Sequence, residues 1–166
     1  SMETLIRDGF IKGVLDLTTT EWCDEIVGGV LAAGPNRLEA AGFMGIPQVV
    51  SVGALDMVNF GPFKTVPEEF KNRILYKHNP TVTLMRTNVE ENIKVGRKIV
   101  EKLNSATGPT VMMLPLNGVS MIDAPGQPFY GKEEDEALFN ELRIGLNRDV
   151  VELIELNNHI NDQEFA

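Results

Sequence analysis

The sequence predicts an α/β protein, a Rossmann-like three-layer sandwich built around a mostly parallel sheet of five strands. Short apolar segments alternate along the chain with segments whose apolar residues recur at helical spacing. The connections between the apolar segments are long enough for the right-handed crossovers that join parallel strands. The segments 47–52 and 110–114 are almost continuously apolar, as strands buried on both faces of a parallel sheet are.

The strands of this sheet are the short apolar segments themselves. Five are expected, at residues 13–17, 47–52, 81–85, 110–114 and 151–156. All five are expected to run in the same direction, because a helical segment separates each strand from the next. Their carboxyl ends therefore meet at one edge of the sheet, which is where ligands bind in such folds.

Two of the expected helices begin at capping boxes, in which a threonine bonds the amide three residues on and a glutamate reaches back. These are Thr18-Thr19-Thr20-Glu21, before a helix that ends at Gly28-Gly29, and Thr87-Asn88-Val89-Glu90, before the clearest helix of the chain. Further helices are expected at 3–10, from Gly34-Pro35 to Gly42, at 65–73 and at 132–146, the last with an acidic first turn.

Composition excludes several classes of partner. The chain has 15 Lys and Arg against 24 Asp and Glu, a formal net charge of −9, so nucleic-acid binding is not expected. No apolar run reaches the roughly 18 residues of a membrane span, so no membrane partner is expected. The lone Cys23 suits the core and a reducing, cytoplasmic location. Residues 3–166 are expected to form one domain, and Ser1-Met2 suits a cloning remnant.

Residues that directly follow a strand are the first candidates for a ligand site. They are Thr18 to Glu21, 53–59, Arg86-Thr87, 117–123 and 157–162. His159 belongs to this edge, whereas His78 precedes its strand and belongs to the opposite one. We therefore expect a small ligand, a nucleotide or another metabolite, at the carboxyl edge.

Helix starts at this edge favour an anion, because amides, hydroxyls and the positive end of the helix dipole gather there. The candidate phosphate ligands are Thr18, Thr19, Thr20, Glu21, Gly34, Arg37, Arg86 and Thr87. Structural alternatives stand beside them. The threonines would only cap their helices, and Arg86 would pair with Asp16 or Asp56.

The long polar loop 117–131 is a further candidate ligand segment. Gly118 and Ser120 would let backbone amides approach a ligand, and Asp123 is a candidate for Mg²⁺. The acid–base candidates of an enzyme are Asp16, Asp123 and His159. Walker A and GxGxxG motifs are absent, and a nucleophile elbow at Ser120 would require glycine where Ile122 stands.

The chain resembles the tomato mosaic virus resistance protein family in several motifs. They are DLTTTEWCDEIVGGVLAAGPNRLEAAG, IPQVVSVGALDMVNFG, LPLNGVSMIDAPGQPFY and the closing HINDQEFA. They are similar to the second lobe of the two-lobed ATP-binding region of that family. The resemblance implies a Rossmann-like lobe, binding of ATP and Mg²⁺ by the complete region, and a homodimer. It transfers no catalytic residue, and the first lobe with its glycine-rich phosphate loop is missing from this sequence.

Three functions follow as hypotheses. The first is an ATP- or nucleotide-binding module, with phosphate at the helix start after Thr18 or Gly34, Arg86 as counter-charge and Asp123 near Mg²⁺. The second is a hydrolase or transferase that acts on a small phosphorylated or carboxylated metabolite. The third is a structural lobe whose apolar surface pairs with a second copy or with the missing first lobe.

Overall fold

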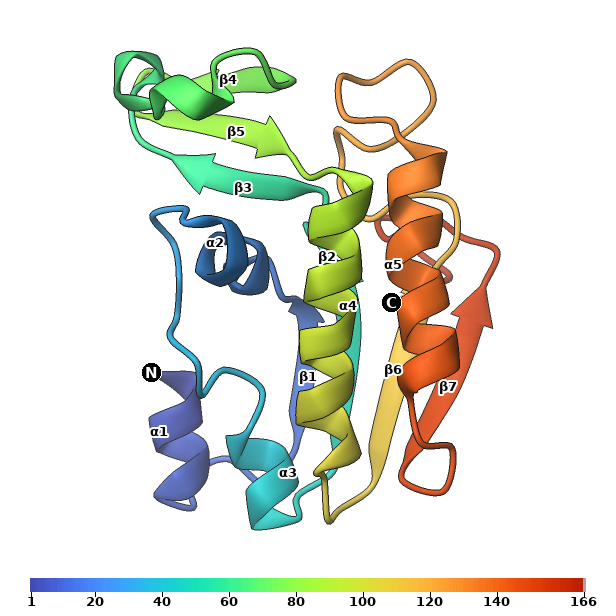
Figure 1. Cartoon of the computed structure of the whole chain (residues 1–166). Helices are drawn as coiled ribbons and strands as arrows, with labels where there is room; N and C mark the ends of the chain where they lie inside the picture. Colours follow the sequence, from blue (N-terminus) through green and yellow to red (C-terminus); the bar gives the residue numbers. More distant parts are fainter. Residues whose placement is uncertain (166) are drawn as a thin grey trace.

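The computed structural model describes residues 1–165 as a mixed α/β protein with two separate sheets (Figure 1). Its strands are β1 (Val14–Thr18), β2 (Gln48–Gly53), β3 (Met57–Phe60), β4 (Leu75–Asn79), β5 (Val82–Arg86), β6 (Thr110–Pro115) and β7 (Val151–Leu156). Its helices are α1 (Met2–Arg7), α2 (Glu21–Val27), α3 (Ala40–Met44), α4 (Val89–Asn104) and α5 (Lys132–Gly145), with 3-10 turns η1 (Phe63–Thr65) and η2 (Glu68–Phe70).

The larger sheet has the strand order β1-β2-β6-β7, and all of its neighbouring strands are parallel. Four of the five expected strands form it, which confirms them within about one residue at each end. Its central strands bury Val50, Val52, Met112 and Leu114 completely, as the continuous apolar runs predicted.

The expected fifth parallel strand at 81–85 is wrong. This segment is β5, which lies between β3 and β4 in a separate antiparallel sheet of three strands. Only Pro80 and Thr81 link β4 to β5, and a link of two residues can join antiparallel strands but not parallel ones. The strands β3 and β4 were not expected at all, and the smaller sheet lies above the carboxyl end of the parallel one (Figure 1).

The capping box expected at Thr18 is also wrong, because Thr18 is the last residue of β1 and α2 begins at Glu21. Thr20 precedes that helix but makes no side-chain capping bond. The second capping box exists one residue later than expected, where Asn88 and Glu91 cap each other's backbone amides at the start of α4.

Two other expected helices are shorter than the sequence suggested. The segment 65–73 contains only the single helical turn η2 and the last residue of η1. The helix expected from Gly34 forms only as α3, because Leu38 before it adopts a φ of 69°, which interrupts any right-handed helix.

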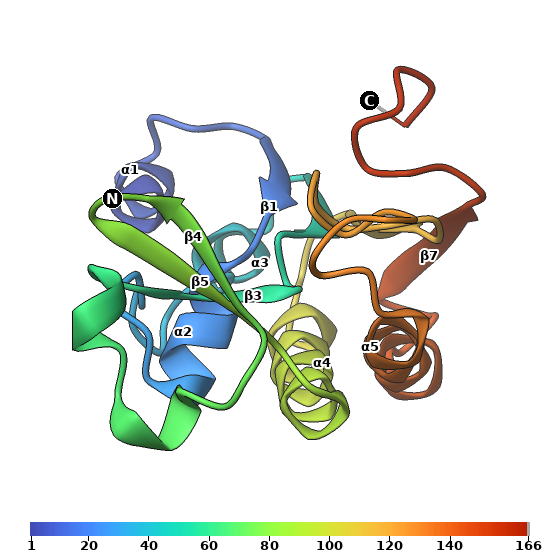
Figure 2. The same ribbon diagram turned by 90° about the horizontal axis from the view of Figure 1, so that it is seen from above.

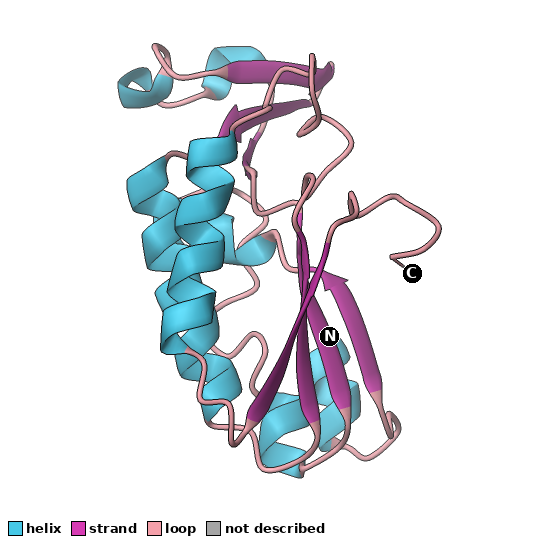
Figure 3. Ribbon diagram, turned by 90° about the vertical axis from the view of Figure 1, so that its right-hand side faces the viewer, coloured by secondary structure: helices cyan, strands magenta, loops and turns pink. Residues whose placement is uncertain are grey.

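The long helices α4 and α5 lie along the same face of the parallel sheet (Figures 2 and 3). The main core lies between them and the sheet, where Val95, Ile99 and Leu103 of α4 are fully buried. The two helices approach closely at Gly96, where an added Cβ would lie 2.7 Å from Glu141 Cβ. Cys23 is fully buried in the same core, as expected.

The opposite face of the parallel sheet is less covered, so the expected three-layer sandwich is only partly formed. Leu15, Val49 and Val111 occupy matched positions on neighbouring strands of that face, and the side chain of Leu15 is 66% exposed. A small cluster of α1 and α3 packs beside β1. None of the described helices combines the length and apolar character needed to cross a membrane.

Candidate functional site

The residues expected at one rim separate into two clusters around two buried arginines. Arg37 lies at the end of β1, with Asp16, Thr18 and Glu21 around it. Arg86 lies at the end of β5 and contacts groups from the loop 117–131 and from α5. The clusters are distinct because β5 leaves the parallel sheet and carries Arg86 with it.

Arg37 forms a two-pronged ion pair with Asp16. Its Nη1 donates to Asp16 Oδ2 at 2.5 Å, and its Nη2 donates to Asp16 Oδ1 at 2.8 Å and to the carbonyl of Thr18 at 3.3 Å. Burial lowers the pKa of Arg37, but the hydrogen bond and charge of Asp16 outweigh it and leave the pKa raised. This arginine is therefore a fixed cation at the end of β1.

Glu21 has an unusual position next to this pair. Its Oε2 is buried, lies 3.5 Å from Arg37 Nε, and finds no hydrogen-bond donor among residues 1–165. A buried carboxylate oxygen without a donor is costly, and a ligand hydroxyl or amide would satisfy it.

A cavity of about 510 Å³ opens beside Arg37, and we call it the β1 cavity. It brings together the end of β1, the start of α2, the loop before α3 and the chain's first residues, with lining residues Ser1, Met2, Glu3, Thr4, Arg7, Asp16, Thr18, Glu21, Ala33, Asn36 and Arg37. Thr19 and Thr20 point elsewhere, since Thr19 donates to the Ser51 carbonyl and Thr20 accepts from Asn59. Gly34 makes a turn with φ of 85° beside the cavity wall.

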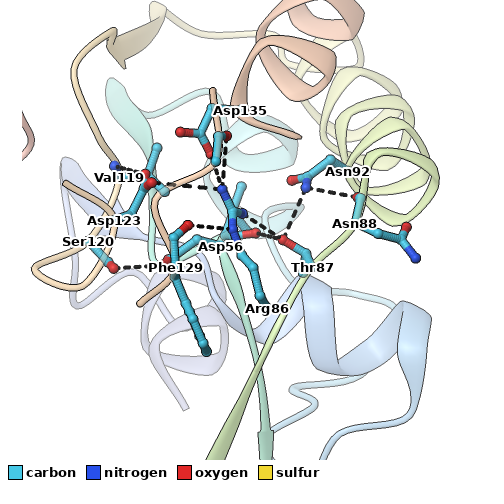
Figure 4. Close-up of polar contacts among 12 residues, drawn as sticks. Asp56, Arg86, Thr87, Asn88, Asn92, Val119, Ser120, Asp123, Phe129 and Asp135 are labelled. Carbon is cyan, nitrogen blue, oxygen red and sulfur yellow. Dashed lines mark hydrogen bonds and ion pairs between the residues drawn. The ribbon is translucent and has the colours of Figure 1, made fainter. Parts of the chain in front are cut away.

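Arg86 is enclosed and is bonded entirely to protein acceptors (Figure 4). Its Nε donates to the Phe129 carbonyl at 2.7 Å, and its Nη1 donates to Thr87 Oγ1 at 3.1 Å. Its Nη2 donates to Asp135 Oδ1 at 2.7 Å and to the Gly131 carbonyl at 3.1 Å. The expected partners Asp16 and Asp56 are not its ion-pair partners, because Asp135 and Asp123 take that place.

Thr87 is also used internally. Its hydroxyl donates to the Leu55 carbonyl at 2.9 Å and accepts from Asn92 Nδ2 at 3.0 Å. Arg86 and Thr87 therefore tie β5, α4 and the loop before α5 together, and both are buried and bonded to protein groups.

Three carboxyl groups gather around the single guanidinium of Arg86. Asp123 is fully buried, accepts from the Val119 amide at 2.9 Å, and keeps Oδ1 without a donor at 3.8 Å from Arg86 Nη2. Asp56 is fully buried and accepts from Ser120 Oγ at 2.6 Å. Burial raises the pKa of Asp56 to about 6, although Ser120 and Arg86 both counteract this.

Asp135 is the third carboxyl and the one nearest to solvent. Burial raises its pKa to about 8 against the opposing charge of Arg86, and the charge of the nearby Asp123 raises it further. Near neutral pH, the Asp135 carboxyl is therefore largely protonated.

A second cavity, of about 520 Å³, opens where Asp135 meets the ends of β6 and β7, and we call it the α5 cavity. Its lining combines apolar, acidic and basic side chains: Leu116, Asn117, Ala124, Pro125, Tyr130, Lys132, Asp135, Glu136, Phe139 and His159. None of the lining residues belongs to the β1 cavity.

His159 lines the α5 cavity but has both ring nitrogens engaged by backbone. The Asn161 amide donates to Nδ1 at 3.1 Å, so Nε2 carries the hydrogen and donates to the Ser120 carbonyl at 2.9 Å. The ring also contacts Gly118, where an added Cβ would lie 2.5 Å from His159 Cδ2 and 2.1 Å from the Asp123 carbonyl oxygen. The ring of His159 thus holds the loop 117–123 in place.

The three acid–base candidates do not form one set, since Asp16 pairs with Arg37 while Asp123 and His159 flank Gly118. The described residues hold no group of three or more His, Cys, Asp or Glu side chains arranged to bind a metal. Sequence reasoning missed Asp135, which was taken only as a dipole partner of its helix. Asp56 was included only through the segment 53–59 and as a possible partner of Arg86, and it was not named as a site residue of its own.

Comparison with known proteins identifies the family. The model of the uncharacterised protein family UPF0261, C-terminal domain, matches residues 1–166. The chain belongs to the UPF0261 family. This confirms the resemblance that the motifs carried.

Its relatives include bacterial and plant proteins. A UPF0261 protein of Clostridium tetani is 69% identical over the whole chain, which covers 41% of that protein. The ToMV resistance protein Tm-1(GCR237) of Solanum lycopersicum is 51% identical, and the chain covers 22% of it. A UPF0261 protein of Rhizobium meliloti is 49% identical, with 42% covered. The chain therefore spans less than half the length of these relatives.

Proposed function

We propose that this UPF0261 domain is a nucleotide-binding lobe, with a Rossmann-like arrangement in which the β1 cavity forms one wall of the site. The observation that carries the proposal is the convergence of the segments 18–21 and 33–37 with the end of β1 on one cavity of about 510 Å³. This volume lies within the range of roughly 300 to 1,000 Å³ that small-molecule sites occupy.

The polar groups of this cavity fit a nucleotide in two respects. Glu21 Oε2 is buried without a hydrogen-bond donor among the described residues, and a ribose hydroxyl would supply one. Arg7 and Thr18 line the same cavity and would meet phosphate oxygens, whereas Arg37 is neutralised by Asp16 and would hold the site's shape. ATP and Mg²⁺ are the ligands that the family resemblance implies, and Mg²⁺ would arrive coordinated by the phosphates.

The remaining wall and the glycine-rich phosphate loop would come from a first lobe. The relatives of the chain are more than twice its length, which leaves room for such a lobe. The exposed sheet face around Leu15 offers an apolar surface either for that lobe or for a second copy of the chain. Light scattering of the isolated domain tests the second copy, because a purely monomeric domain would contradict a homodimer built through this face.

Calorimetric titration with ATP and Mg²⁺ tests the proposal, on the domain and on the full-length protein that contains it. We expect Glu21→Gln to weaken binding by about tenfold, because one charge-assisted hydrogen bond contributes about 1.5 to 3 kcal/mol. Glu25→Gln is the matched control, since Glu25 lies on the same helix but not in the β1 cavity. Absence of binding in both proteins, or equal effects of the two variants, would remove the proposal.

A further inference from the structure

The α5 cavity has a chemistry opposite to that of a phosphate site. Its lining combines apolar groups, from Leu116, Pro125 and Tyr130, with the carboxyl groups of Asp135 and Glu136. It lies at the start of α5, whose first turn is acidic. A ligand that fits both kinds of group carries an aliphatic or aromatic body and a positive charge.

The groups behind Asp135 strengthen this charge preference. Asp123 is fully buried, and its Oδ1 finds no donor among residues 1–165. Arg86 is the nearest cation, but it already donates to the carbonyls of Phe129 and Gly131 as well as to Asp135. With Asp56 also close by, carboxyl groups outnumber the guanidinium, and excess negative charge in a buried place is unfavourable.

The charged groups that surround the α5 cavity also favour a positively charged ligand. The titratable and charged groups around Asp135 are Asp56, Arg86, Asp123, Lys132, Glu136 and His159. The Nδ1 of His159 accepts from the Asn161 amide, and its Nε2 lies 2.9 Å from the Ser120 carbonyl. Lys132 opposes a cation, but Asp135 and Glu136 on the same helical turn outweigh it.

We propose that the α5 cavity binds a primary amine in its ammonium form, with the ammonium on Asp135 and the carbon chain along Leu116, Pro125 and Tyr130. The ammonium takes the place of the proton that Asp135 carries. One R–NH₃⁺ is bound and one H⁺ is released to solvent, so the net charge of the site together with its ligand is unchanged. This site is separate from the β1 cavity and does not depend on nucleotide binding.

The proposal predicts a pH dependence with a definite sign. Below a pKa of about 8, Asp135 carries a proton that must leave when the amine binds. The dissociation constant should therefore rise about tenfold for each unit that the pH falls from 7.5 to 6.5. In Asp135→Asn, which has no proton to release, this dependence should vanish together with most of the affinity.

The test uses n-butylammonium chloride as probe and n-butanol as its neutral counterpart, titrated into the ¹⁵N-labelled domain. We expect n-butylammonium to shift the amide signals of residues 117–124 and 131–136, and n-butanol at the same concentration to leave them unchanged. Calorimetry in buffers of different ionisation enthalpy would report release of one proton for each amine bound. ATP titrated afterwards should bind as before, because it occupies the other cavity.

Glu133→Gln is the matched control for Asp135→Asn, since Glu133 lies in the same helical turn but not in the cavity. Equal shifts with n-butylammonium and n-butanol, or a dissociation constant that stays constant from pH 6.5 to 7.5, would overturn the proposal. Both measurements are made on the unmodified domain, so they decide the matter even if Asp135→Asn fails to fold.

Discussion

The two buried arginines, Arg37 and Arg86, have different hydrogen-bond partners, although both lie near the carboxyl ends of strands. Arg37 bonds mainly to one carboxylate, Asp16, at the wall of a cavity. Arg86 bonds to two backbone carbonyls, a threonine and Asp135, inside a shell of protein. The first pair lies beside a carboxylate, Glu21, whose Oε2 has no hydrogen-bond donor among residues 1–165. In the second cluster, four of the five N–H groups of the Arg86 guanidinium donate to protein acceptors.

This difference teaches that an arginine at a strand end is not by itself a sign of a ligand. The backbone carbonyls of a distant loop can accept hydrogen bonds from the same guanidinium N–H groups that would otherwise bind a phosphate. Among the described residues, both clusters contain buried carboxylate oxygens without a donor, on Glu21 in the first and on Asp56 and Asp123 in the second. What distinguishes the clusters is that Arg37 and Glu21 line the β1 cavity, whereas Arg86 is enclosed by protein acceptors.

Removal of Arg86 should have the largest effect. Arg86→Met would leave Asp123 and Asp135 buried without their cation and would free the carbonyls of Phe129 and Gly131. We expect a loss of about 3 to 5 kcal/mol in the free energy of unfolding, measured by urea denaturation. Arg97→Met, at an exposed pair with Glu141, should change it by less than about 0.5 kcal/mol. A similar small loss for Arg86→Met would mean that the cluster contributes nothing to stability.

The second largest effect should be the change of stability with pH. The pKa of Asp135 is raised to about 8 and that of Asp56 to about 6, so the folded state binds more protons than the unfolded state above pH 4. Stability is therefore favoured at low pH and falls as the pH rises through these values, by about 2 to 3 kcal/mol between pH 6 and 8. Denaturation at several pH values measures this fall, and Asp135→Asn should remove most of it. An unchanged slope in that variant would show that another group titrates.

Arg37→Met should cost less than Arg86→Met, about 2 kcal/mol, because water in the β1 cavity can hydrate the remaining carboxylate of Asp16. Replacement of both partners, Asp16→Leu with Arg37→Met, should recover part of that loss. Thermal denaturation of the three proteins provides the comparison. If the double variant is less stable than Arg37→Met alone, Asp16 and Arg37 do not behave as an isolated pair.

The smallest effect is expected at Ser120. Ser120→Ala removes the hydroxyl that donates to Asp56 Oδ2 and lowers the pKa of that carboxyl. The pKa of Asp56 should rise further, and stability at pH 7 should fall by about 1 kcal/mol. Infrared titration of the carboxyl band together with denaturation measures both changes. A variant with an unaltered titration would show that Asp56 is held by other donors.

Much of the fold could be predicted because it depends on local patterns. The apolar runs at 47–52 and 110–114 are typical of buried strands, and the apolar residues of α4 recur at helical spacing. Neither pattern depends on which element packs against it. The strand at 82–86 was equally visible as a strand, but its direction and its sheet depend on β3 and β4, which carry no comparable pattern. The same error displaced Arg86 from the expected rim.

The sequence by itself determined the alternation of strands and helices, the buried central strands and the family. Only the tertiary structure decided which charged groups meet, because a pairing such as Arg86 with Asp135 joins residues 49 positions apart and leaves no local periodicity. It also decided that Asp135, one acid among several in a helical turn, is the one turned inward toward Arg86, where burial raises its pKa. Periodicity records which face of an element is apolar, whereas the pKa of a side chain depends on every charge that folding brings near it.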